Sequence, residues 1–238
     1  MRKWRTRSGY EIFQIMTGRS NVYLLTNSVT NILIDTSVSK SWNRLLKQLY
    51  KLNILHVEYL ILTHTHFDHA ANANRIKEKF KCSVIVHKDV AKYLKKGESN
   101  IPGGTNFFTG FLVNILSKFV STSILKYEPC DPDIIVDFDY DLKELGFKAF
   151  LKHTPGHTIG SMSLIIDDEI AIVGDTMFGI FINSIFPPYA DDIDLMIRSW
   201  GNLLDTKCIR FLPSHGTAND RSLVQKDYDR RIKSLILH

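Results

Sequence analysis

The stretch Thr63-His64-Thr65-His66-Phe67-Asp68-His69 decides the fold. It follows a predominantly apolar run, residues 57–62, which is typical of a buried strand that ends at one edge of a sheet. His64 and His66 are two positions apart, so in an extended segment both rings leave on the same side of the chain. Two imidazoles placed in this way can reach one cation through their ring nitrogens. The stretch therefore predicts a metal site at the end of a strand.

Asp68 and His69 add two further candidate ligands directly after this pair. Residues 70–80 carry apolar side chains at helical spacing, which predicts a helix with Asp68 and His69 at its N-terminus. From there the two side chains can point away from His64 and His66, and this arrangement suggests two adjacent cations. A single histidine is more commonly structural than a ligand, but four potential ligands within six positions favour the metal site.

The composition is that of a folded protein. With 238 residues and a hydrophobic fraction of 44%, we expect one domain over residues 1–238 with a sizeable core. The formal charge of +5 is spread over the N-terminal tail, helices and loops, which favours an ordinary solvated surface over a nucleic-acid face. No apolar segment follows the basic start, and no run of about 18 apolar residues occurs, so we expect neither export nor a membrane span. The three cysteines contain no C-x-x-C pair, which favours buried thiols and a reducing, cytoplasmic compartment.

The order of the expected elements indicates the fold class. Three short β-rich runs, residues 10–16, 21–25 and 31–34, are separated by turn residues and predict a meander. A helix, the strand at residues 57–62, a second helix and a strand at 83–86 follow. The second half repeats this plan with extended runs at 134–138, 147–151, 162–166 and 170–173, a helix at about 191–204, a strand at 209–212 and a last helix from about residue 220. This order predicts an α/β protein, an αββα four-layer sandwich with two β-rich halves packed face to face.

Three further candidate ligands lie in the second half, each directly after a predicted strand. His157 lies in Thr-Pro-Gly-His-Thr, Asp175 in Gly-Asp-Thr-Met-Phe, and His215 in Pro-Ser-His-Gly. Loops at strand ends are where rigid scaffolds present functional groups, and a neighbouring glycine lets the backbone approach a crowded site. Each of these turns alone is weak support, but the three together with the histidine cluster favour a joint set of ligands.

In these motifs the sequence resembles the metallo-β-lactamase-fold hydrolases, and the glyoxalase II-like members among them. The resemblance spans about residues 10–215. It implies two divalent metal ions, with zinc as the default and iron or manganese as alternatives. The ligand set that it implies is His64, His66 and His157 for one ion, Asp68, His69 and His215 for the other, and Asp175 as the bridge. Asp35 occupies a position that in this family supports the ligands without binding metal.

Two cations about 3.5–4 Å apart share a water that loses a proton near neutral pH, and the resulting hydroxide attacks a carbonyl or phosphoryl centre. We expect Asp68 to be the catalytic residue that orients this hydroxide and passes a proton to the leaving group. No separate nucleophile is then needed, so Ser161 and Ser214 are interpreted as structural.

Two apolar segments stand out beyond the metal-site motifs. Residues 97–132 form an apolar helical insert, centred on the pattern from Phe107 to Val120. Core packing or a homodimer contact is the main interpretation of this insert, and a lid or a contact with a membrane surface are the alternatives. Residues 178–189 follow Asp175 and must begin near the metals. Both segments favour a small-molecule substrate with an apolar part over a nucleic acid.

Departures from known subfamilies narrow the function. Only residues 216–238 follow His215, too few for the glutathione-binding helical domain of glyoxalase II, and Asp175 stands where true β-lactamases have Cys or Ser. Phe178 stands where quorum-quenching lactonases have tyrosine. We therefore predict a binuclear metal-dependent hydrolase of a small ester, thioester or lactone. A phosphodiesterase or nuclease of the same fold is the first alternative, and an iron-dependent redox protein is the second.

Overall fold

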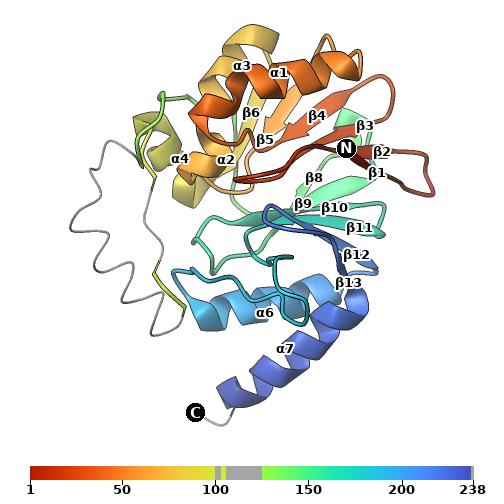
Figure 1. The fold of residues 1–238 in the computed structure, drawn as a ribbon, viewed down its shortest axis with the longest axis vertical. Coiled ribbons are helices and arrows are strands. Elements are labelled where there is room, and N and C mark those ends of the chain that lie inside the picture. The colour runs from red at the N-terminus through yellow and green to blue at the C-terminus, as the bar shows by residue number, and fades with distance from the viewer. Residues whose placement is uncertain (100–102, 106–124, 237–238) are drawn as a thin grey trace.

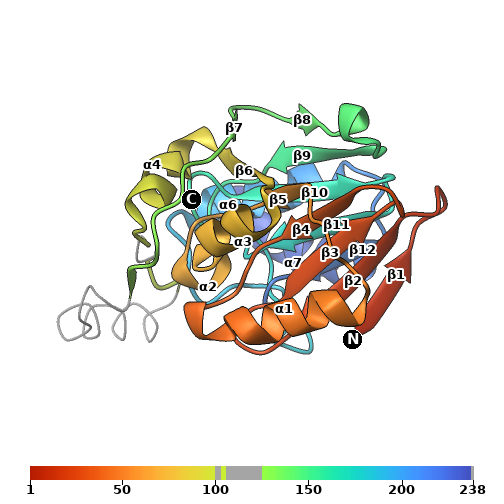
Figure 2. The same cartoon turned by 90° about the horizontal axis from the view of Figure 1, so that it is seen from above.

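The protein is built from two β-sheets that pack face to face, with helices on both outer faces (Figures 1 and 2). The structure is a computed structural model, and it describes residues 1–99, 103–105 and 125–236. Within these ranges the first sheet contains seven strands in the order β1 to β7, and the second contains six in the order β13 to β8. The predicted α/β class and the αββα sandwich are confirmed.

The first sheet begins antiparallel and ends parallel. Its antiparallel strands are β1 (Arg2–Arg5), β2 (Glu11–Met16), β3 (Val22–Thr26) and β4 (Asn31–Ile34). Its parallel strands are β5 (Tyr59–Ile61), β6 (Ser83–His87) and β7 (Ile134–Val136). The assignment of residues 134–138 to the second half of the sandwich was wrong, because β7 pairs with β6, with Ile134 opposite Ile85. Strand β1 was not predicted, since three of its four residues are basic and only Trp4 is apolar.

The second sheet is mostly antiparallel. Its strands are β8 (Tyr140–Asp141), β9 (Ala149–His153), β10 (Met162–Ile166), β11 (Ile170–Gly174), β12 (Arg210–Pro213) and β13 (Asn219–Asp220). Only β11 and β12 are parallel among its pairs of neighbouring strands. Every residue of β10 and β11 is buried, as expected for central strands that are covered on both faces.

Helices cover the outer face of each sheet (Figure 1). On the first sheet lie α1 (Trp42–Lys51), α2 (Phe67–Ala70), α3 (Ala73–Phe80) and α4 (Lys88–Lys96). On the second lie α6 (Ile193–Leu204) and α7 (Arg221–Ile236), and two short 3-10 turns occur at Ser39–Ser41 and Lys143–Leu145. Helix α4 was not predicted, because its polar residues outnumber its few buried apolar ones.

The helix predicted from residue 70 to residue 80 is interrupted at Asn72. The backbone N–H of Asn72 donates to the Thr36 hydroxyl, and the hydroxyl of Ser20 donates to the Asp68 carbonyl, so neither group takes part in an α-helical bond between Asp68 and Asn72. Asp68 and His69 therefore lie within the short helix α2 instead of at the N-terminus of the long one.

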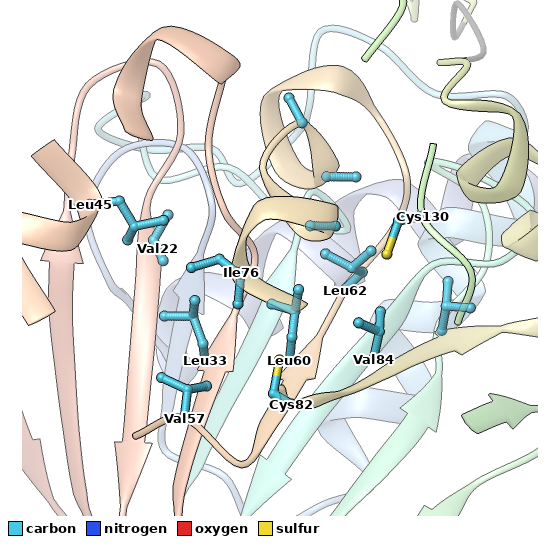
Figure 3. Close-up of a cluster of buried hydrophobic side chains, with 14 of the residues drawn as sticks. Val22, Leu33, Leu45, Val57, Leu60, Leu62, Ile76, Cys82, Val84 and Cys130 are labelled. Atoms are coloured by element: carbon cyan, nitrogen blue, oxygen red, sulfur yellow. The ribbon is translucent and has the colours of Figure 1, made fainter. Parts of the chain in front are cut away.

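Three apolar layers hold the sandwich together. The first lies between the first sheet and helices α1 and α3, where Figure 3 shows Leu33 and Leu60 of the sheet beside Ile76 of α3. The second fills the space between the two sheets, and the third lies between the second sheet and helices α6 and α7 around the buried Trp200. All three cysteines are free and buried, as predicted.

The pattern from Phe107 to Val120 lies outside the described residues, and so does the homodimer contact predicted through it. The described ends of this insert form isolated antiparallel β-bridges, between Glu98 and Lys126 and between Gly104 and Tyr189. Among the helices in residues 1–99, 103–105 and 125–236, none is long and apolar enough to cross a membrane.

Candidate metal centre

The seven predicted ligands come together at one edge of the sandwich, where β5, β9, β11 and β12 end. The loop after β5 carries His64 and His66, and helix α2 carries Asp68 and His69. The β9–β10 loop carries His157, and the segments after β11 and β12 carry Asp175 and His215. These residues are far apart in the sequence. They meet because the carboxyl ends of β5 in the first sheet and of β9, β11 and β12 in the second lie at this edge of the sandwich (Figure 2).

Three imidazoles form the first group. One ring nitrogen each of His64, His66 and His157 lies within 4.8 Å of the other two. Nδ1 of His66 and Nε2 of His157 are 3.1 Å apart, and the His66 ring stands edge-on to the other two rings. Such an arrangement presents nitrogen lone pairs to a shared point, as in a three-histidine metal site.

Asp68, His69 and His215 form the second group. Nε2 of His69 lies 3.8 Å from Oδ1 of Asp68, and Nε2 of His215 lies 3.7 Å from Oδ2 of the same carboxylate. Asp175 stands between the two groups. Its Oδ1 is 3.5 Å from Nε2 of His69, while its Oδ2 is 3.2 Å from Nε2 of His215 and 3.5 Å from Nε2 of His157.

Neighbouring groups orient the imidazoles. Nδ1 of His69 lies 2.8 Å from Oδ2 of Asp35, and the backbone N–H and hydroxyl of Thr63 also donate to this carboxylate. Nδ1 of His157 donates to the Tyr189 carbonyl at 2.9 Å. These bonds fix which nitrogen of each ring faces the cluster, a common feature of metal-binding histidines. Asp35 itself contacts His69 and Thr63, as expected for a supporting residue.

Close contacts and left-handed backbone conformations occur at this edge of the sandwich. Gly174 has a φ of +55°, and a Cβ at this position would lie 2.8 Å from the Thr63 side chain. Asp35 also adopts a left-handed conformation, with a φ of 62°. Such conformations are costly for a residue other than glycine and are concentrated at functional sites. Here the turn places the Asp35 carboxylate under His69.

Burial and neighbouring charge set the protonation of the cluster. Burial lowers the pKa of His64, His66 and His157 below the ordinary value, so these rings are neutral at neutral pH with lone pairs available. Burial also acts to lower the pKa of His69, but the carboxylates of Asp175, Asp35 and Asp68 outweigh it and raise this pKa well above the ordinary value. A proton and a cation therefore compete for Nε2 of His69.

The unpaired polar atoms of the cluster test whether it fits a metal. Among the described residues, Oδ1 of Asp175 and the Nε2 atoms of His64, His66 and His69 are buried without a hydrogen-bond partner. Leaving such atoms unpaired costs free energy, and native proteins rarely do so without a reason. One nitrogen each of His64 and His69 and one oxygen of Asp175 also lie within 4.8 Å of one another. The donor set therefore fits a divalent cation.

Sequence reasoning did not single out Arg19. Its Nε lies 3.4 Å from Oδ2 of Asp68, and 62% of its side chain is exposed. Arg19 belongs to the β2–β3 turn, where Gly18 and Ser20 gave only a turn signal. The carbonyl of Tyr189 was likewise missed, because a backbone contact leaves no trace in the residue type.

Comparisons with known proteins agree with this geometry. The sequence profile of the metallo-beta-lactamase superfamily matches residues 15–215. A probable metallo-hydrolase of Methanocaldococcus jannaschii is 32% identical over 85% of this chain and 90% of its own length. A hydroxyacylglutathione hydrolase of Pelagibacter ubique is 29% identical over 69% of this chain and 54% of its own length.

A solved structure shows the same fold. The archaeal metallo-beta-lactamase superfamily protein from Sulfolobus tokodaii superposes with a TM-score of 0.62 at 20% identity, over 90% of this chain and 80% of its own. The chain belongs to the metallo-beta-lactamase superfamily. It is a metal-dependent hydrolase of that superfamily, with His/Asp clusters able to bind metal ions.

Proposed function

We propose that this chain is a binuclear metallo-hydrolase that acts on a small ester, thioester or lactone. One observation carries the binuclear assignment: Asp175 directs its two oxygens toward different groups of ligands, Oδ1 toward His69 and Oδ2 toward His157 and His215. A carboxylate in this position suits a bridge between two cations better than a ligand to one.

The ligands divide into two sets on either side of Asp175. His64, His66 and His157 would hold one ion, and Asp68, His69 and His215 the other. Three imidazoles favour zinc, whereas the set that contains Asp68 also suits iron or manganese. When bound, the two ions supply a hydroxide nucleophile and a Lewis acid at the substrate oxygen.

Asp68 is the proposed catalytic residue. Its two oxygens face different neighbours, Oδ1 toward His69 and Oδ2 toward both His215 and Arg19. Only 11% of its side chain is exposed, whereas 62% of the neighbouring Arg19 side chain is exposed. From this position Asp68 can hold a proton and deliver it to a leaving group.

Apolar side chains beside the cluster support a substrate with an apolar part. The ring of Phe178 lies 4.5 Å from the ring of His215. The loop that follows exposes Ile180, Phe181 and Ile182, with 91% of Ile182 accessible. This segment begins beside the cluster at Phe178, and its exposed apolar side chains would suit an acyl group.

A phosphodiester is the second candidate substrate, and Arg19 is the observation that favours it. Its largely exposed guanidinium stands at the rim of the cluster. Arginine is well suited to bind phosphate oxygens in a bidentate manner.

Steady-state kinetics of the metal-loaded protein distinguish the two substrates. We expect kcat/KM for esters, thioesters or lactones to exceed that for phosphodiesters. The Arg19→Ala variant should keep this activity within a few-fold, and Arg75→Ala on α3 is the control for loss of one exposed positive charge. Dominant phosphodiester cleavage that is lost in Arg19→Ala and kept in Arg75→Ala would overturn the acyl assignment.

A further inference from the structure

A second pair of histidines lies outside the seven-ligand cluster. His87 ends β6 of the first sheet, and His153 ends β9 of the second. Asp89 lies in the first turn of α4, directly after His87. One ligand atom from each of these three residues lies within 4.8 Å of the other two. The group therefore joins the two sheets.

Hydrogen bonds fix the tautomer of both rings. Nε2 of His87 lies 3.3 Å from the Asp137 carbonyl, and Nε2 of His153 lies 2.7 Å from the Ile159 carbonyl. Carbonyl oxygens only accept, so both Nε2 atoms carry a proton, and in a neutral ring Nδ1 keeps its lone pair. Burial, followed by the neighbouring His153, lowers the pKa of His87, which keeps that ring neutral. Metal-binding histidines commonly donate their second nitrogen to a carbonyl in this way.

Two acceptors of the group lie side by side. Nδ1 of His87 lies 3.4 Å from Oδ2 of Asp89, and no proton lies between a lone pair and a carboxylate oxygen. The backbone N–H of Asp89 reaches the same nitrogen only at 3.4 Å, a long hydrogen bond. Gly160 packs against this side of the ring, where a Cβ would lie 3.2 Å from Nδ1 of His87. A cation would resolve the repulsion between these acceptors.

We propose that His87, His153 and Asp89 form a third metal site, which binds one borderline divalent cation such as Zn²⁺. Two imidazoles and a carboxylate are donors that zinc prefers, and solvent can complete the coordination because the Asp89 side chain is 35% exposed. The two rings are stacked at 4.1 Å with an interplanar angle of 13°. Lone pairs lie in the ring planes, so binding requires the half-buried His153 to turn out of this stack about its bonded Nε2.

A cation bound at this site would link the first sheet to the second sheet near the proposed catalytic centre. It connects β6 and α4 of the first sheet with the end of β9 of the second. His153 is followed directly by the loop that carries His157. A bound ion would therefore stabilise the folded protein and hold the start of this loop, without supplying chemistry itself.

Metal analysis after equilibrium dialysis against Zn²⁺ tests this site. The unaltered protein is compared with His153→Ala and with Asp89→Asn, which keeps the shape of the side chain but removes its charge. His56→Ala removes an exposed histidine elsewhere and is the matched control. The readout is the difference in bound zinc between the protein and each variant, so it does not depend on how many ions the seven-ligand cluster holds.

We expect His153→Ala to bind one zinc fewer than the unaltered protein, and Asp89→Asn to bind the same ion at least about 10-fold more weakly. His56→Ala should bind as much zinc as the unaltered protein. The zinc-dependent rise in melting temperature should be smaller in His153→Ala. Equal zinc content in the unaltered protein and His153→Ala overturns the proposal, and so does an equal loss in His56→Ala.

Discussion

Two buried carboxylates at opposite ends of the β10–β11 hairpin have contrasting surroundings. At one end, the Met162 N–H donates to the Thr63 carbonyl beside the seven-ligand cluster, where Oδ1 of Asp175 has no hydrogen-bond partner in the described part of the chain. At the other end, Asp167 accepts from the backbone N–H and the hydroxyl of Ser8, both at 2.8 Å, and from Nζ of Lys148 at 3.0 Å. Hydrogen-bond donors therefore satisfy the carboxylate of Asp167, whereas one oxygen of Asp175 is left without a donor among the described residues.

The contrast between Asp175 and Asp167 indicates which carboxylate serves a binding site and which one stabilises the fold. Serine and lysine donors fully satisfy Asp167, which ties the turn after β1 to the second sheet. Among the described residues, the charged or polar side chains nearest to the Asp175 carboxylate are the imidazoles of His69, His157 and His215, the donor types that also bind a cation. Buried polar groups without partners are rare in native structures, so a gathering of them indicates a binding site. Substitutions in the seven-ligand cluster should therefore lower turnover and change stability little. Substitution of Asp167 should lower stability and change turnover little.

The largest effect is expected for Asp68→Asn. The amide keeps the shape and one metal-binding oxygen but loses the charge and the proton acceptor, so kcat should fall by about 10²–10⁴. The melting temperature should change little. Asp167→Asn is the control at the other end of the β10–β11 hairpin, where turnover should be retained. Near-normal turnover of Asp68→Asn would assign the proton transfer to another group.

A smaller effect is expected for Asp35→Asn, which weakens the partner of His69. Nδ1 of His69 lies 2.8 Å from this carboxylate, which orients the ring and makes Nε2 more basic. Zinc affinity of the cluster should fall by about 10–100-fold, as for other groups that support metal ligands. Competition with a chromophoric chelator measures the change. An unchanged affinity would show that the hydrogen bond from His69 does not support metal binding.

The smallest effect is expected for Asp167→Asn, and it concerns stability alone. The pKa of Asp167 is lowered to about 2, because hydrogen bonds from Ser8 and the charge of Lys148 outweigh the effect of burial. Lys148 is largely exposed, so the expected loss at pH 7 is about 1–2 kcal/mol in the free energy of unfolding.

This contribution depends on pH in a defined direction. A depressed pKa stabilises the fold above the unfolded value of about 3.9, and the stabilisation disappears as the pH falls toward about 2. Urea unfolding at pH 7 and near pH 2.5 should therefore show a difference between Asp167→Asn and the unaltered protein that shrinks at the lower pH. A difference that stays constant would contradict the assigned role of the charge.

The sequence predicted the two sheets and their layers because apolar periodicity and turn residues are local signals. It also identified the seven residues that meet at one edge, because each lies in or directly after a strand-end motif. It missed the break at Asn72 and the contact between Arg19 and Asp68, which depend on side chains from distant segments. The placement of β7 was wrong for the same reason, since three residues of Ile134–Val136 do not specify which sheet they join.

Metal stoichiometry of the seven-ligand cluster tests the central claim most directly. Measuring it in the His153→Ala background removes the separate site proposed at His87. We predict close to two metal ions per chain in that background, and a selective loss of one when His157 is also changed to alanine. A single ion per chain, with full hydrolytic turnover, would contradict the binuclear centre.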